Sequence, residues 1–222
     1  ARADGPRLRR LARFLGRHFY RERIVRLFAA SRALARGRGR DPLALLDAPG
    51  FGALLDAAEL GSSTTADGVA ALVEAALEKT LADLPYAGDL VRYEGALFRA
   101  EAGPRRWGDG GLVPDGIPVR AESARVVTLA WDVAGLVAAV RRGDRSLPVP
   151  PRVATRLLIA LSPDGRVTTV RCSDAVERLL GALDGARAVE GIARLVGVAE
   201  AHARDALRQL TAVGAVAWRP SP

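Results

Sequence analysis

The 222-residue sequence has no methionine and only one cysteine, Cys172. A single cysteine cannot form a disulfide within the chain or a multi-cysteine metal cluster. Cys172 follows a run of alternating residues and has no histidine nearby, so we expect a structural thiol rather than a nucleophile. Because no initiator methionine is present, we expect the numbering to begin inside a longer chain.

Histidine is almost as scarce. His18 and His202 lie in different halves of the chain, and neither has a partner at the spacing of a metal-binding motif. The sequence also lacks a G-x-S-x-G nucleophile elbow, and no pair of carboxylates stands out from the rest. These absences predict a chain that is not itself an enzyme and holds no metal or cofactor.

No apolar run reaches the length of a membrane span, and the basic start lacks the apolar core and cleavage site of a signal peptide. We therefore expect a cytoplasmic protein with no membrane partner. The composition is that of a globular protein, with 49% hydrophobic and 26% charged residues.

The positive charge is unevenly distributed. Residues 1–40 carry 13 arginines and two acids, whereas residues 41–117 carry 13 acids and five basic residues. Leucines and other apolar residues recur among the arginines from Pro6 to Ala35, which predicts one amphipathic helix, or two with a break near residues 16–18. This helix could pack on its own domain, or it could lie on a membrane or on RNA. The acidic segment that follows favours the first alternative, and we do not expect a nucleic-acid partner.

The rest of the first half also predicts helices. They cover residues 51–58, a stretch from a capping box at Thr64 and Asp67 to Leu81, and residues 86–102. A segment rich in Gly, Pro and Asp follows at 103–118 and is typical of a linker. We therefore expect a helical bundle over residues 1–117, acting as a docking domain.

The second half predicts a small antiparallel sheet with helices. A strand at 124–131, a helix at 133–142 and a proline-rich stop at 148–151 precede the hairpin of residues 155–161 and 167–170. Three short helices follow, the first capped by Ser173, and a strand at 215–218 closes the chain. The expected fold class is α+β, with a winged-helix-like domain over residues 118–222.

Two phrases in this domain, at residues 183–193 and 207–214, resemble the PqqD-like module called the RiPP recognition element, where RiPP denotes a ribosomally made and later modified peptide. The resemblance implies that the leader of a precursor peptide adds as a strand beside the sheet and against the third helix. The implied peptide-binding residues are Thr169, Val170, Arg171, Arg204, Leu207 and Arg208. The alternative for these arginines is that they are simply solvated.

The phrase Asp89-Leu-Val-Arg-Tyr-Glu-Gly-Ala-Leu-Phe98 gives a second resemblance. A helix of this kind, followed by a half that contains strands, resembles the partner subunits of multinuclear non-heme iron-dependent oxidases in methanobactin and thiaglutamate biosynthesis. It implies a heterodimer with a TIM-barrel oxidase that holds the iron, while this chain binds the leader. The alternative function is a transcription regulator that places residues 199–213 in the major groove, because winged helices also bind DNA.

Overall fold

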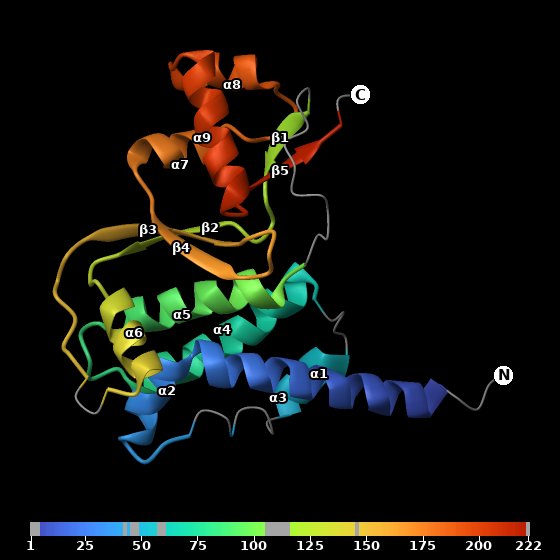
Figure 1. Ribbon diagram of the computed structural model, residues 1–222. Coiled ribbons are helices and arrows are strands. Elements are labelled where there is room, and N and C mark those ends of the chain that lie inside the picture. Colours follow the sequence, from blue (N-terminus) through green and yellow to red (C-terminus); the bar gives the residue numbers. More distant parts are fainter. Residues whose placement is uncertain are drawn as a thin grey trace. The chain divides into compact units, whose positions relative to one another are not determined.

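The computed structural model describes residues 5–41, 44, 49–56, 61–104, 116–144 and 147–220. These residues form helices and small antiparallel sheets, which confirms a protein of mixed α and β structure (Figure 1). Their contacts divide the chain into two compact units. We call Ala1–Gly103 with Leu129–Ala154 the helical unit, and Pro104–Thr128 with Thr155–Pro222 the sheet unit. Most of the expected linker at 103–118 lies outside the described residues.

The helical unit contains α1 (Gly5–Leu27), α2 (Ala29–Arg36), α3 (Pro49–Asp56), α4 (Ser63–Thr80), α5 (Ala87–Ala102) and α6 (Ala134–Arg142). Helix α5 is its centre, because twelve of its sixteen residues are buried and α1, α2 and α4 all pack on it. The ring of Phe98 lies 6.2 Å from that of Tyr20 and 5.7 Å from that of Phe28, measured between centroids. The apolar spacing that predicted a helix at 86–102 therefore also identified a core element.

The first two helices are divided at Phe28, where φ is −95° and ψ is 35°. The predicted break near residues 16–18 is wrong, since α1 runs through this stretch without interruption. The new helix starts where a buried carboxylate can meet its first free amides. Glu94 of α5 accepts hydrogen bonds from the backbone N–H of Ala30, at 2.8 Å, and of Ser31, at 3.0 Å.

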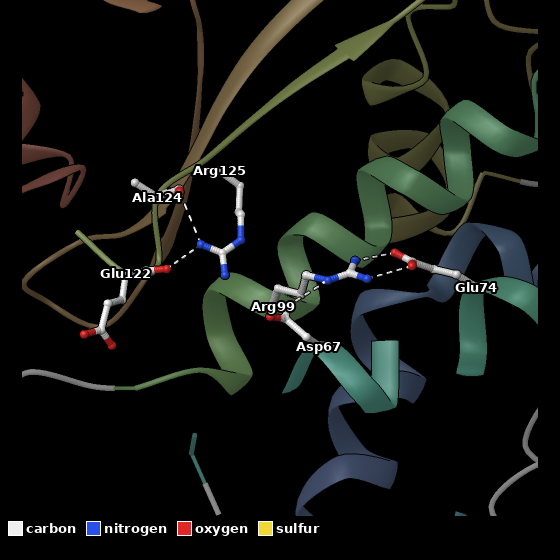
Figure 2. A network of polar contacts seen from close by, with 6 residues as sticks. All are labelled: Asp67, Glu74, Arg99, Glu122, Ala124 and Arg125. Atoms are coloured by element: carbon white, nitrogen blue, oxygen red, sulfur yellow. Dashed lines mark hydrogen bonds and ion pairs between the residues drawn. The ribbon is translucent and has the colours of Figure 1, made fainter. Parts of the chain in front are cut away.

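A half-buried ion pair joins α4 to α5. Figure 2 shows the guanidinium of Arg99 directed at the carboxylate of Glu74, to which it donates two hydrogen bonds, and Asp67 lies on the other side, 3.1 Å from Arg99 Nε. The cap of α4 is Ser62, whose hydroxyl accepts from Thr65 N–H at 3.2 Å. The predicted capping box was therefore placed two residues too late, because Asp67 pairs with arginine instead.

Residues 129–154 belong to the helical unit, although the predicted domains were contiguous and placed this segment in the second one. One carboxylate oxygen of Asp89 in α5 accepts the backbone N–H of Ala130 at 2.6 Å and of Trp131 at 2.9 Å. The Trp131 ring packs edge-on to Tyr86, and α6 packs on α2. These contacts explain why the segment leaves the sheet.

The sheet unit contains β1 (Ile117–Arg120), β2 (Arg125–Leu129), β3 (Thr155–Leu161), β4 (Val167–Arg171), α7 (Asp174–Gly181), α8 (Val189–Val196), α9 (Glu200–Ala212) and β5 (Val216–Arg219). Strands β2, β3 and β4 form one sheet in that order, and β1 pairs antiparallel with β5 in another. The helix predicted at 133–142, between β2 and the hairpin of β3 and β4, is present as α6. Strand β1 was not predicted.

The connection from β1 to β2 is closed by local hydrogen bonds. Ala124 N–H donates to the carbonyl of Ala121 at 3.0 Å. The Arg125 guanidinium donates to the backbone carbonyls of Glu122 and Ala124, as drawn in Figure 2. The arginine thus fixes the turn that leads into β2.

One apolar core joins the three C-terminal helices to the strands. Its larger members come from β3, α7 and the turn after it, α8, α9 and β5, and include Leu158, Leu179, Leu180, Leu183, Ile192, Leu207, Leu210 and Val216. The predicted Ser173 cap is confirmed, since its hydroxyl accepts Val176 N–H at 3.3 Å. The core therefore supports the helix side of the hairpin.

Candidate functional site

Strand β4 is held by a hairpin whose geometry follows from its sequence. Gly165 has a φ of +81°, and its N–H donates to the carbonyl of Ser162 at 2.8 Å. Only glycine adopts this backbone region without strain. The strands then pair in register from Leu161 with Val167 to Leu157 with Arg171.

The outer side of β4 is an open edge among the described strands, because β4 pairs only with β3. The hydrogen bonds that flank the ladder, from Ser162 N–H to Arg166 and from Cys172 N–H to Arg156, show which residues face β3. In an antiparallel pair the residues alternate between those that bond to the partner and those that do not. Thr168 and Val170 therefore direct their backbone groups to β3.

The backbone N–H and C=O groups of Val167, Thr169 and Arg171 consequently point away from the sheet. Unpaired groups of this kind are a template for another strand. This places two of the predicted residues, Thr169 and Arg171, where an added peptide would form its hydrogen bonds. We call this row of three residues the β4 edge.

The third predicted strand residue, Val170, lies on the other face. Its register partner Leu158 belongs to the core under the helices, and Thr168, on the same face, donates its hydroxyl to the Val213 carbonyl at 2.9 Å. That bond ties β4 to the end of α9. Val170 is 37% exposed, so part of its side chain remains accessible beside the edge.

The predicted residues of α9 have different environments. Leu207 is completely buried in the core, so it supports the helix and does not offer its side chain to a peptide. Arg204 pairs with Glu200 at 2.7 Å, and Arg208 pairs with Asp205 at 2.8 Å. Both arginines thus already have a carboxylate partner on their own helix.

Arg171 differs from them, because it is exposed and makes no ion pair with any residue that the structure describes. At the same open end of the hairpin, Arg156 of β3 pairs with Asp174 and with Glu177, the latter at 2.9 Å. In the sequence, Asp174 and Glu177 follow the Ser173 cap and are typical of an acidic first turn of a helix. The sequence did not reveal that Arg156 binds them, because Arg156 lies 18 residues before Asp174 in the chain.

Thr168 was also missed as a positioning residue. Alternation along the strand predicts its face, but not that its hydroxyl would meet the end of α9. No local signal in the sequence reveals this bond.

The described residues include no group of three or more His, Cys, Asp or Glu side chains that could hold a metal ion. His202 on α9 is exposed, and so is His18 on α1. Cys172 is buried at the end of the hairpin, and burial raises the pKa of its thiol above the ordinary value. A thiol with a raised pKa is a poor nucleophile.

Among the described helices, none combines the length and apolar character needed to cross a bilayer. No protein-family model matches the chain, and no curated protein matches it.

Proposed function

We propose that this chain is a non-catalytic partner subunit that binds the leader of a ribosomal precursor peptide and presents it to an iron-dependent peptide-modifying oxidase. The β4 edge carries the proposal, because it offers outward-directed backbone groups on a strand braced by α9. As part of the proposal, the hairpin, the three helices and β5 form a winged-helix-like recognition module. The helical unit is the part that docks on the enzyme.

A leader that adds to the β4 edge would exchange main-chain hydrogen bonds with Val167, Thr169 and Arg171. Main-chain bonds give affinity without selecting a sequence, so selection depends on side chains nearby. The exposed guanidinium of Arg171, which makes no ion pair with a described residue, favours an acidic residue in the leader, since a charge-assisted hydrogen bond is stronger than a neutral one. Arg204 and Arg208 contribute less, because each would first have to leave its own carboxylate.

A tethered leader raises the effective concentration of the peptide's reactive segment at the oxidase. In this proposal all iron ligands belong to the TIM-barrel enzyme, and the two proteins form a heterodimer. The chain contributes binding and orientation alone.

The decisive experiment replaces Thr169 by proline. Proline lacks the N–H that this residue directs outward, yet it removes no hydrogen bond to β3, so the hairpin is retained. We expect Thr169→Pro to weaken binding of a fluorescently labelled precursor peptide about tenfold or more, because the ring also obstructs the incoming strand. Candidate precursors and oxidases are to be sought among the neighbouring reading frames, and fluorescence anisotropy measures the affinity.

The matched control is Thr169→Val, which keeps the N–H and the strand preference. It should bind the peptide as the wild type does. Equal peptide affinity of Thr169→Pro and wild type, with both proteins folded by circular dichroism, would contradict strand addition at this edge. If the wild-type chain does not bind the peptide but retards duplex DNA in a mobility-shift assay, and does so less at higher salt, the result would instead support a transcription regulator.

A further inference from the structure

The first half of α1 exposes an apolar stripe. Leu8, Leu11 and Leu15 are between 47% and 62% exposed, and Phe14 beside them is 67% exposed. The three leucines follow the spacing i, i+3 and i+7, so they lie on one side of the helix. In Figure 1 this part of α1 extends beyond the other helices of its unit.

This stripe is not the side of α1 that packs on the helical unit. The packed side is formed by Tyr20, Ile24 and Leu27, which are buried. At 3.6 residues per turn, the five residues from Leu15 to Tyr20 rotate the helix by about 140°. The expectation that this helix simply packs on its own domain thus holds for its second half, whereas the first half turns a second apolar side to the outside.

Positive charge accompanies the stripe. Arg7 and Arg10 are exposed, and neither forms an ion pair with another described residue. Contact between the stripes of two copies of this chain would bring like charges together, which disfavours self-association. The charge therefore favours a partner with carboxylates at this site.

The stripe is also short. Glu22, seven residues after Leu15, continues the same side of the helix with an exposed carboxylate. An anionic lipid surface would repel this group, whereas a groove of about two helical turns would end before it. Anchors at i, i+3 and i+7 are typical of a helix that lies in the groove of another protein.

We propose that residues 8–15 of α1 form the docking helix of this chain and insert into an apolar groove, edged by carboxylates, on the partner oxidase. This inference rests on the proposed function and names the surface through which the heterodimer forms. Leu8, Leu11 and Leu15 enter the groove, and Arg7 and Arg10 pair with its rim.

The test measures binding of the full chain to the purified oxidase by biolayer interferometry. We expect the double variant Leu11→Gln with Leu15→Gln to bind about tenfold to a hundredfold more weakly, since buried apolar anchors dominate such interfaces. Glutamine keeps the helix propensity close to that of leucine. The control is Leu72→Gln on α4, an exposed leucine of the same unit, which should bind as the wild type does. The variant Arg7→Gln with Arg10→Gln should reduce both the affinity and its dependence on salt.

The outcomes separate the two proposals. If the wild type binds the oxidase and the leucine double variant binds equally well, the docking helix is wrong while the partner role stands. If the wild type binds no oxidase, both proposals fail. If the double variant loses affinity for phosphatidylglycerol vesicles but not for the oxidase, the stripe is a lipid-binding surface and the inference is overturned. Precursor affinity, measured in parallel, should be the same for all variants.

Discussion

The carboxylate of Glu94 accepts a hydrogen bond from the backbone N–H of Ser31 at 3.0 Å, deep inside the helical unit. It also accepts from Ala30, so one side chain of α5 satisfies two of the first amides of α2. The positive end of the α2 dipole favours the ionised form. Burial acts more strongly in the opposite direction and raises the pKa of Glu94 from 4.5 to about 7.

This shift predicts how stability depends on pH. Between about pH 4.5 and about pH 7 the folded chain holds a proton on Glu94 that the unfolded chain releases, so the free energy of unfolding falls as the pH rises through this window. The total change is on the order of 3 kcal/mol. Glu94→Gln cannot titrate, and urea unfolding of this variant should show a flatter profile over the same range. The exposed Glu78→Gln serves as control and should keep the wild-type slope.

Gly95 in α5 should not tolerate alanine. A Cβ at this position would lie 1.7 Å from Glu74 Oε1 and 2.9 Å from an Arg99 nitrogen, so the Glu74 carboxylate would have to leave the ion pair. We expect Gly95→Ala to lower the free energy of unfolding by about 1–2 kcal/mol, although alanine is the better helix former. Gly88→Ala in the same helix meets no atom within 4 Å and should be neutral or stabilising. Thermal unfolding of both variants checks the contrast, and equal melting temperatures would show that Glu74 moves without cost.

Both the backbone angle of Gly214, just after α9, and the space around it favour glycine at this position. Its φ is +80°, and an added Cβ would lie 2.0 Å from the carbonyl oxygen of Leu161. Because that atom is backbone and cannot move aside, we expect Gly214→Ala to cost about 3 kcal/mol or more. Gly197 has a similar φ of +74° but open space around it, so Gly197→Ala should cost only about 1–2 kcal/mol. A chemical denaturation series that ranks the two variants in the reverse order would refute the steric argument.

Asp89 should stabilise the segment that follows β2. Its carboxylate accepts the N–H groups of Ala130 and Trp131, and Asp89→Ala leaves both without this acceptor. We expect a loss of about 1–3 kcal/mol and faster amide hydrogen exchange at these two residues. Asp89→Asn retains one acceptor oxygen and should fall between the wild type and the alanine variant. Unchanged exchange in the alanine variant would mean that other contacts hold the segment.

The parts of the fold that could be predicted from sequence are those with local signals. The turn at residues 163–165 and the alternation on either side located the hairpin, and Ser173 located the start of α7. Alternation along a strand at 167–171 also predicts Thr169 and Arg171 on one face and Val170 on the other. The open edge of β4 could only be a hypothesis at that point, because it depends on the order of the strands in the sheet. The structure gives this order as β2-β3-β4.

The errors concern interactions between distant residues. The start of α2 depends on Glu94, more than sixty residues away, and β1 depends on pairing with β5 near the other end of the unit. The resemblance implies Leu207 as a peptide contact, yet its side chain is completely buried in the core. The periodicity of α9 contains Leu207 and Leu210 together, and this signal could have assigned both to the core.

The assignment of residues 129–154 to the helical unit has a consequence for synthesis of the chain. The polypeptide passes from one unit to the other after residues 103, 128 and 154, so neither unit is one continuous stretch. On the ribosome, α5 would emerge long before α6, and the helical unit could be completed only after about residue 154 had left the exit tunnel. A gene cut near residue 118 would therefore yield two incomplete pieces, one holding α1 to α5 without α6 and the other holding α6 without the helix α2 on which it packs.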